Sequence, residues 1–385
     1  MPAQGGLLPQ SPEIQPDPRR LAMRGVHRAI AELRRGTPVL ICSNETALLI
    51  GAAETLSAAG LTDIISGSLA APVLLLAPMR AAALLRRPVT QADDHAVVAL
   101  HLPGTALQPD RLRGFADPTA ENLLPSEAEA LAPPALAGAA LALAKLGRLL
   151  PALVAAPALP AVAERLSLLR VSAADIEAYP ITAASSLKRV AEARVPLEDA
   201  PEARIIAFRA ADGGIEHLAI LVGDPVASAA AGKAPLARAH SECFTGDLLG
   251  SLRCDCGPQL RGAIKRMAED PAGGVLLYLA QEGRGIGLVN KLRAYTLQDR
   301  GLDTLDANRA LGYGADERNF LVAATMLREL GLTRVRLLTN NPDKLSGLSA
   351  CGIEVVGREA HQFDPNGVND AYLDTKARRF GHMLG

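Results

Sequence analysis

Three cysteines in the C-terminal half have the type and spacing of a metal site. Cys243, Cys254 and Cys256 form a C-x10-C-x-C pattern, in a chain with 5 cysteines. Thiols this close together are more typical of metal binding than of disulfides, and soft thiolates suit Zn²⁺. A zinc with three thiolates keeps one position open for water and lowers the pKa of that water. His240 and Cys351 are alternative fourth ligands that would close the site, although Arg238 and Glu242 beside His240 suggest a substrate-facing strand.

The glycine-rich segment 281–287, QEGRGIG, is a second candidate site. It follows a predicted strand and precedes a predicted helix, where glycines let backbone N–H groups approach an anion and Arg284 can bind phosphate through two N–H groups. A tight strand-to-helix connection explains the same glycines equally well. The segment is not a Rossmann fingerprint, since no acidic residue follows a second strand at the expected distance.

Two further segments place polar residues at predicted helix starts. Asp316 and Glu317 can compensate a helix dipole, whereas Arg318 in the first turn is unfavourable and suggests a functional role. Thr339 and Lys344 flank a strand end that runs into a helix, where they can bind phosphate or a base edge. A capped loop with an exposed lysine is the alternative explanation of that segment.

The elements that must position these residues alternate along the C-terminal half. Apolar periodicity predicts helices at 258–268, 288–298, 317–330 and 341–350. Strands are predicted at 204–209, 215–222, 274–279, 335–339 and 353–356. We therefore expect an α/β (α+β) fold with helices packed on a mixed sheet.

The N-terminal half is rich in alanine and leucine and offers almost no clusters of His, Cys, Asp or Glu. Its sequence predicts a helix at 27–35, a buried strand at 37–42 and a helical segment from there to Gly60. The charged, proline-containing stretch 185–201 predicts a boundary. We expect a disordered tail at 1–20 and two domains, at 21–184 and 185–385.

The composition excludes several classes of protein. The chain of 385 residues has 40 Lys and Arg against 41 Asp and Glu, a net charge of -1, so it is not a general nucleic-acid binder. Aromatic residues make up 3%, too few for a stacking platform for single strands. The most apolar region, 131–162, is interrupted by prolines and charges and does not predict a membrane span. Without a secretory signal or a disulfide framework, we expect a cytoplasmic protein.

Five segments in order resemble GTP cyclohydrolase II, an enzyme of riboflavin biosynthesis. They are RAHSECFTGDLLGSLRCDCG (238–257), QEGRGIGLVNKLRAYTLQDRG (281–301), LGYGADERNF (311–320), RLLTNNPDK (336–344) and YLDTKARRFGH (372–382). The resemblance implies hydrolysis of GTP to formate, pyrophosphate and 2,5-diamino-6-(5-phospho-ribosylamino)pyrimidin-4(3H)-one. It also implies one Zn²⁺ per subunit, Mg²⁺ with the triphosphate, and a homodimer.

The resemblance implies roles for individual residues. The matches to the zinc ligands, with water in the fourth position, are Cys243, Cys254 and Cys256. Asp316 matches a proton acceptor, Arg318 a nucleophile toward the α-phosphate, and Tyr295 a residue that orients the purine. The matches to GTP contacts are Arg238, Ala239, His240, Ser241, Glu242, Gln259, Glu282, Gly283, Arg284, Thr304, Thr339 and Lys344. Because a guanidinium stays protonated, charge stabilisation is the alternative role of Arg318.

One position departs from the resemblance. Ala280 stands immediately before Gln281, where many relatives have arginine. A positive charge beside the triphosphate is therefore missing from this strand end, which bears on GTP affinity more than on chemistry.

Parts of the N-terminal half (29–54, 134–153 and 171–179) resemble 3,4-dihydroxy-2-butanone-4-phosphate synthase. The acidic run that binds Mg²⁺ in that family has one carboxylate here, Glu45, and its His-Thr-Glu signature is replaced by Leu136-Ala-Gly138. Because a Mg²⁺ site needs more oxygen ligands, we expect a degenerate synthase fold kept for packing, dimerisation or regulation. The alternatives are a bifunctional enzyme that also makes 3,4-dihydroxy-2-butanone 4-phosphate, and a GTP-sensing zinc module without catalysis.

Overall fold

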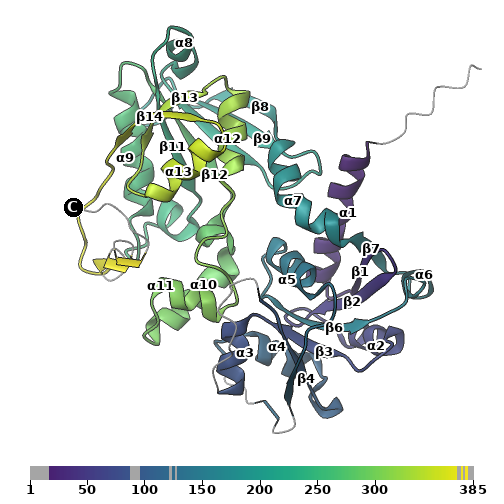
Figure 1. Cartoon of the computed structure of the whole chain (residues 1–385). Helices are drawn as coiled ribbons and strands as arrows, with labels where there is room; N and C mark the ends of the chain where they lie inside the picture. Colours follow the sequence, from purple (N-terminus) through teal and green to yellow (C-terminus); the bar gives the residue numbers. More distant parts are fainter. Residues whose placement is uncertain are drawn as a thin grey trace, which may run out of the picture.

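Two seven-stranded sheets organise the chain. The structure is a computed structural model that describes residues 17–86, 96–120, 124–125, 128–370, 374–375 and 378–379. Most of the predicted tail 1–20 and of the segment 372–382 lies outside the described residues. In Figure 1 the sheets form two lobes, with α7 (Ala173–Ser185) running between them. Among the described residues, no helix combines the length and apolar character needed to cross a bilayer.

The first sheet defines the N-terminal lobe (17–185). Its order is β5-β4-β3-β6-β2-β1-β7, antiparallel except for the parallel pair β1–β7. The strands are β1 (Val39–Ser43), β2 (Thr46–Ala52), β3 (Val73–Leu76), β4 (Val98–His101), β5 (Glu129–Leu131), β6 (Ala152–Pro157) and β7 (Leu169–Ser172). Besides α7, the helices are α1 (Pro18–Arg35), α2 (Ala58–Gly67), α3 (Pro78–Leu85), α4 (Pro109–Ala116), α5 (Ala137–Leu146) and α6 (Val162–Arg165). One apolar cluster packs α1, α5 and α7 on one face of this sheet.

Strand β2 shows that the predicted helical segment between residue 43 and Gly60 was wrong. Thr46–Ala52 pairs antiparallel with β1, and Asn44 takes a φ of 48° in the tight turn between them. The strand lies between β6 and β1 and is almost completely buried, so strand pairing and burial outweigh the helix preference of its alanines and leucines. The helix starts later, at Ala58, with the Ser57 side chain as its cap.

The second sheet defines the C-terminal lobe (186–379). Its order is β14-β13-β11-β12-β10-β9-β8; the first four strands are parallel and the remaining pairs antiparallel. The strands are β8 (Lys188–Arg194), β9 (Arg204–Arg209), β10 (His217–Val222), β11 (Leu236–Ser241), β12 (Gly274–Leu279), β13 (Arg334–Leu338) and β14 (Glu354–Glu359). The helices are α8 (Pro225–Ala230), α9 (Cys256–Ala268), α10 (Leu288–Asp299), α11 (Thr304–Ala310), α12 (Phe320–Glu329) and α13 (Pro342–Ala350). The expected α/β class with a mixed sheet is confirmed.

Helix α12 begins three residues later than predicted. The Asn319 side chain accepts a hydrogen bond from the backbone N–H of Leu321 and caps the helix at Phe320. Asp316 and Arg318 therefore lie in the preceding loop. The prediction that Arg318 lies in the first turn of the helix and opposes its dipole was wrong. Arg318 is instead held by an ion pair with Asp316 in that loop.

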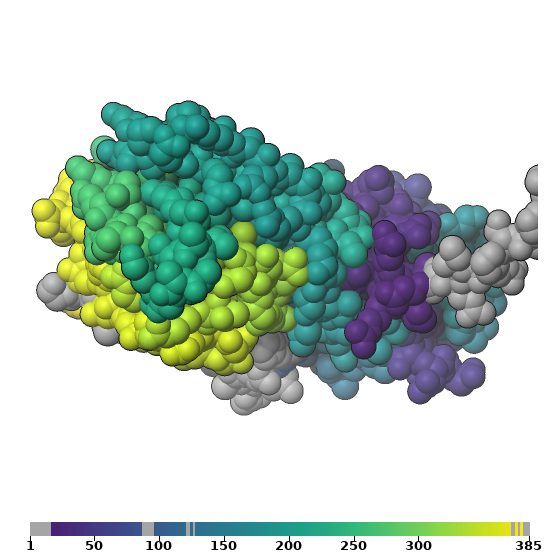
Figure 2. All heavy atoms as spheres, turned by 90° about the horizontal axis from the view of Figure 1, so that it is seen from above, coloured from purple at the N-terminus to yellow at the C-terminus, as the bar shows by residue number. Residues whose placement is uncertain are grey.

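The two lobes share one apolar cluster. Helices α2, α3 and α4 cover the second face of the first sheet. Three residues of the C-terminal lobe pack into the same cluster: Ile286 before α10, Leu297 in α10 and Leu311 directly after α11. Arg293 of α10 adds ion pairs at 2.9 Å to Glu54 and to Asp117 of the N-terminal lobe. Figure 2 shows the lobes side by side in an elongated molecule.

Candidate active site

The carboxyl ends of β11 and β12 bring the candidate residues together. These strands are parallel and in register, so Ser241 at the end of one lies opposite Leu279 at the end of the other. The cysteine segment leaves the sheet after β11, and the glycine-rich segment leaves it after β12. Ligands of open α/β sheets bind at this edge, outside the carboxyl ends of the strands.

The three thiols of Cys243, Cys254 and Cys256 lie within 4.8 Å of one another, the single group of this kind among the described residues. The Sγ atoms of Cys243 and Cys254 are 3.8 Å apart. The chain turns through a π-helical segment, Phe244–Leu248, in which Gly246 leaves room for them; a Cβ there would lie 2.7 Å from Cys254 Sγ. Three thiol sulfurs that converge on one point, next to a glycine that leaves space for an ion, fit a tetrahedral metal such as Zn²⁺.

Neither alternative fourth ligand belongs to this group. His240 Nε2 is 3.1 Å from both carboxylate oxygens of Asp247 instead. Cys351 directly follows α13 and packs against the apolar cluster of the C-terminal lobe. The protein thus offers three thiol ligands at this site.

Lys291 supplies positive charge to the thiols. Its Nζ donates to Cys243 Sγ at 2.9 Å and to Glu282 Oε1 at 2.8 Å. Hydrogen bonds from Cys254 and Cys256, together with Lys291, hold the pKa of the Cys243 thiol well below its usual range. The hydrogen bond to Cys243 raises the pKa of Cys254 to about 11. The lysine therefore favours the thiolate form of Cys243.

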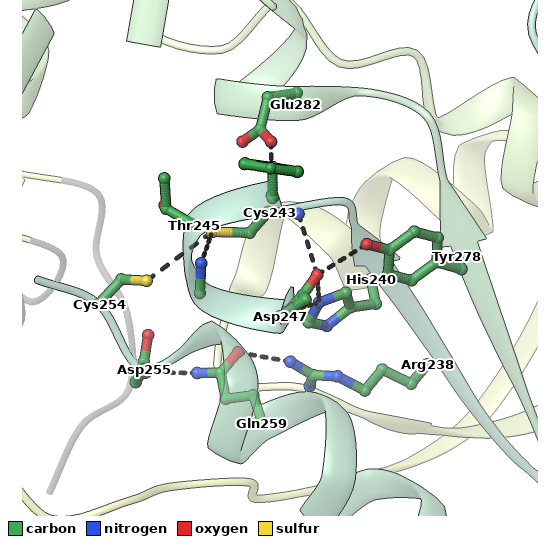
Figure 3. Close-up of polar contacts among 12 residues, drawn as sticks. Arg238, His240, Cys243, Thr245, Asp247, Cys254, Asp255, Gln259, Tyr278 and Glu282 are labelled. Atoms are coloured by element: carbon green, nitrogen blue, oxygen red, sulfur yellow. Dashed lines mark hydrogen bonds and ion pairs between the residues drawn. The ribbon is translucent and has the colours of Figure 1, made fainter. Parts of the chain in front are cut away.

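A buried carboxylate, Asp247, fixes the turn that carries Cys243. It accepts hydrogen bonds from the backbone N–H of Cys243 at 2.9 Å and from the Tyr278 hydroxyl at 3.0 Å, as Figure 3 shows. Burial lowers the pKa of His240, so its imidazole is neutral near pH 7. With Nε2 donating to Asp247, Nδ1 is an acceptor, and it has no partner among the described residues.

A polar cavity of about 130 Å³ lies on one side of the thiols. Arg238 donates to Gln259 Oε1, and Gln259 donates to Asp255, both at 2.5 Å (Figure 3). Burial lowers the pKa of Arg238 to about 10, still well above neutrality. The predicted site residues on the cavity wall are Arg238, His240, Ser241, Glu242, Gln259, Glu282, Gly283, Arg284, Arg318, Thr339 and Lys344.

A larger cavity of about 550 Å³ lies on the other side. Tyr295 and Thr304 line it together with all three cysteines. The Tyr295 ring lies 5.0 Å from the guanidinium carbon of Arg253 and 5.7 Å from Lys291 Nζ. The residues that line both cavities are Cys243, Cys256, Gly283, Arg284 and Lys291. The thiols thus stand between two adjoining cavities.

Two predicted site residues line neither cavity. Ala239 contributes its backbone carbonyl, which accepts from Lys344 Nζ at 2.7 Å. Asp316 is paired with Arg318, whose Nε lies 2.8 and 3.0 Å from its two oxygens. Burial opposes the charged form of Asp316, but Arg318 outweighs it and lowers the Asp316 pKa. Asp316 therefore holds Arg318 against the polar cavity in this conformation.

The glycine-rich segment is wound tightly against the loop that holds this pair. Gly283 and Arg284 both take φ values near 60°, in the left-handed region that a residue such as arginine seldom adopts. A Cβ on Gly285 would lie 2.9 Å from the backbone oxygen of Glu317, so only glycine permits this approach. The Arg284 carbonyl accepts from the backbone N–H of Glu317 at 3.1 Å.

A relative from Azospirillum brasilense, named GTP cyclohydrolase-2, is 52% identical over 376 residues, 94% of each chain. The chain belongs to the GTP cyclohydrolase II family. The family model described as GTP cyclohydrolase II matches residues 188–360. A GTP cyclohydrolase-2 from Pasteurella multocida is 48% identical over 200 residues, 52% of this chain and 89% of the relative. The riboflavin biosynthesis protein RibBA from Chlorobium phaeovibrioides is 42% identical over 223 residues, 58% of this chain and 53% of the relative.

Solved structures also match this GTP cyclohydrolase II family member. The two-domain 3,4-dihydroxy-2-butanone 4-phosphate synthase RibBX from A. baumannii is 18% identical, with 88% of this chain and 99% of that chain covered and a TM-score of 0.33. A synthase in complex with two magnesium ions is 19% identical, with 40% and 95% covered and a TM-score of 0.31. TM-scores this low do not assign the fold of the N-terminal lobe.

Sequence reasoning missed several residues of this cyclohydrolase site. Asp247 lies four positions after Cys243, and Lys291 lies in the first turn after the glycine-rich segment. Asp247 lies between two of the cysteines and Lys291 lies just after the glycine-rich segment, so their closeness to these motifs could have identified them. Arg148 of the N-terminal lobe, whose guanidinium donates to the Ala280 carbonyl at 2.5 Å, had no signal in the sequence.

Proposed function

We propose that this protein hydrolyses GTP to formate, pyrophosphate and 2,5-diamino-6-(5-phospho-ribosylamino)pyrimidin-4(3H)-one. The observation that carries the proposal is the convergence of three thiols between two cavities. All predicted GTP-contact residues except Ala239 line one cavity or the other. Membership of the GTP cyclohydrolase II family supports the same reaction.

We propose Cys243, Cys254 and Cys256 as ligands of one Zn²⁺ per subunit. The bound zinc would supply a Lewis acid that activates water for attack on the purine ring. Lys291 stabilises the anionic thiol of Cys243 through its 2.9 Å hydrogen bond. Asp247 holds the backbone of the same cysteine in place. The protein thereby keeps the donors converged and partly neutralises their charge.

The polar cavity suits the charged and hydrogen-bonding parts of a nucleotide. Arg284, Arg318 and Lys344 bring positive charge to its wall, which phosphate groups carrying Mg²⁺ require. Neutral His240 can accept a hydrogen bond at Nδ1. Burial raises the pKa of Glu242, although Arg148 opposes the shift. Glu242 and Gln259 are half-buried and can bond a guanine edge, and a wrong base would leave these groups unpaired.

The catalytic roles follow from the same geometry. We propose that Arg318 stabilises charge at the α-phosphate, since it lines the polar cavity and its guanidinium pairs with Asp316. Asp316 can act as a proton acceptor once GTP draws Arg318 away from it. Tyr295, whose pKa burial raises, stays protonated and can orient the purine from the larger cavity.

Replacement of one ligand tests the zinc assignment and the reaction together. Cys256→Ser should lose zinc and formate release, because serine does not supply a soft thiolate. Cys351→Ser is the matched control, since Cys351 lies outside the thiol group and should keep both. Metal content and formate are measured on both purified variants with GTP and Mg²⁺. Retained zinc and full turnover in Cys256→Ser would contradict the assignment.

For the rest of the chain, we propose a degenerate synthase-like domain at 21–184 and the cyclohydrolase domain at 185–385. Glu45 is exposed in the β1–β2 turn, and no group of three potential metal ligands other than the thiols occurs among the described residues. Turnover of ribulose 5-phosphate should therefore be undetectable, whereas a bifunctional enzyme would show it. GTP binding without hydrolysis would instead indicate a sensing module. The homodimer and the cytoplasmic location stay predictions.

A further inference from the structure

One short segment of the N-terminal lobe, Lys145–Leu149, lies directly against the GTP cyclohydrolase site. The segment comprises the last two residues of α5 and the turn after it, and Arg148 in that turn takes a φ of 56°. Its backbone is fixed by two residues of the C-terminal lobe. Asn290 donates to the Arg148 carbonyl at 3.0 Å, and the Tyr313 hydroxyl donates to the Leu149 carbonyl at 2.6 Å. Asn290 and Tyr313 are themselves buried, so the segment is held in one place.

The Arg148 side chain reaches from there to the strand ends that carry the site. Its Nη2 donates to the Ala280 carbonyl at 2.5 Å, at the end of β12, and its Nη1 is 4.0 Å from Glu242 Oε1. The aliphatic part of Arg148 crosses Gly287, where a Cβ would lie 3.0 Å from the Arg148 Cδ. Arg148 thus contacts the chain at both ends of the glycine-rich segment, at Ala280 and at Gly287. Its guanidinium also places positive charge beside Glu242.

Lys145 acts on the opposite loop. Its Nζ donates to Glu317 Oε1 at 2.8 Å, and the same oxygen accepts from the backbone N–H of Gly314 at 2.7 Å. Glu317 in turn donates its backbone N–H to the Arg284 carbonyl. Lys145 therefore ties down the residue that lies between Asp316 and Arg318 and contacts the glycine-rich segment.

Other contacts also join the two lobes. The shared apolar cluster and the ion pairs of Arg293 with Glu54 and Asp117 already join them. The contacts of Arg148 and Lys145 are instead made to the segments that carry Glu242, Arg284 and Arg318. The Arg148 hydrogen bond to the Ala280 carbonyl therefore fixes the residue directly before the glycine-rich segment, in addition to joining the lobes.

We propose that the Lys145–Leu149 segment completes the GTP site, with Arg148 and Lys145 as positioning residues supplied by the N-terminal lobe. Arg148 holds the end of β12 and orients Glu242, and Lys145 holds the loop of Arg318 through Glu317. The N-terminal lobe would then contribute to GTP binding without chemistry of its own. The inference rests on the proposed GTP hydrolysis.

Steady-state kinetics of the full chain test the inference. Arg148→Ala should raise the KM for GTP about tenfold, the effect of losing a hydrogen bond made by a charged group, with kcat within about twofold of wild type. Arg148→Lys should recover much of the loss, because it restores the charge and a donor. Lys145→Ala should raise KM in the same direction but less, since Glu317 keeps its bond to Gly314. Arg165→Ala is the matched control: Arg165 is exposed and bonds a carbonyl, that of Ser66, within its own lobe.

Zinc content and thermal unfolding, measured on the same samples, separate positioning from folding. A purely structural role of Arg148 would lower kcat and zinc content together and leave KM unchanged, because fewer molecules would be active; that result overturns the inference. Equal KM values for Arg148→Ala and Arg165→Ala overturn it as well. A wild-type protein that binds zinc but consumes no GTP contradicts the proposed function instead, and the two failures are thereby distinguishable.

Discussion

At the scale of single residues, Lys291 supplies the positive charge that a cluster of three thiolates needs. It lies half-buried between Cys243 and Glu282, and although burial disfavours its charged form, hydrogen bonds to both residues raise the Lys291 pKa. A zinc bound by three thiolates carries net negative charge, which this ammonium offsets.

Replacing Lys291 should therefore weaken metal binding without removing a ligand. We expect Lys291→Met to lower zinc affinity by about tenfold, a typical cost of losing a side chain that supports metal ligands. Competition with a chromogenic chelator measures the change. Lys265→Met, which removes an exposed lysine from α9, should bind zinc like the wild type. Equal affinities of the two variants would contradict the role of Lys291.

His217 makes folding stability depend on pH. Its Nδ1 accepts the backbone N–H of Ala280 at 3.0 Å, and burial and then Arg148 lower its pKa to about 4. Because the folded pKa lies below the unfolded one, the stability from neutral His217 is complete above about pH 6.5 and is lost as the pH falls toward 4.

Between about pH 7 and pH 5 this one group should cost about 2 kcal/mol of unfolding free energy. His217→Asn keeps an acceptor near the position of Nδ1 and does not titrate. Urea unfolding of both proteins at both pH values gives the comparison, since all other titrating groups are common to them. The same pH dependence in wild type and variant would show that His217 is not responsible.

At the scale of elements, the π-helical turn Phe244–Leu248 shapes the group of three thiols. Gly246 donates its N–H to Cys243 Sγ at 3.3 Å while its Cα faces Cys254 and Cys256. A Cβ would lie 2.7 to 2.9 Å from atoms of all three cysteines, closer than packed atoms tolerate.

Gly246→Ala should therefore separate the thiols and abolish stoichiometric zinc binding. Gly138→Ala is the control, because nothing lies within 4 Å of the Cβ added there in α5. Metal analysis of the purified variants decides, and a Gly246→Ala protein with one zinc per chain would show that the turn adapts to a side chain.

Local signals account for the elements that the sequence predicted correctly. Predicted helix 288–298 matches α10, since periodicity and a preceding glycine mark it, and predicted strand 274–279 matches β12. The start of α12 was predicted three residues too early, because the residue that caps the helix is Asn319. The spacing of the sequence does not distinguish Asn319 from the acidic residues before it. Strand β2 was misread because its alanines and leucines favour a helix until pairing with β1 and β6 buries them.

For the candidate site as well, local motifs identified some residues, whereas others depend on contacts between distant segments. Cysteine spacing and the glycine-rich segment marked the thiols and Arg284 directly. The parallel pairing of β11 and β12, which brings these segments together, is a long-range property that no single segment contains. Arg148 contacts Ala280 across 132 positions of sequence, so its role appears only in the folded chain.

At the scale of the whole molecule, one shared apolar cluster joins two lobes, and the three thiols lie in the C-terminal one. The N-terminal lobe carries no comparable group of potential metal ligands among its described residues, yet Lys145 and Arg148 reach the site from it. We propose that the N-terminal lobe positions loops of the C-terminal lobe through these two side chains.

The proposed function requires that the protein open the purine ring of GTP at the thiols between the two cavities. The most direct measurement incubates zinc-replete full-length protein with Mg²⁺ and GTP isotope-labelled at C8, and follows the label by NMR. We expect the label to leave as formate, with one pyrophosphate released for each formate. Unchanged GTP, or pyrophosphate released while the label stays in the ring, would contradict it.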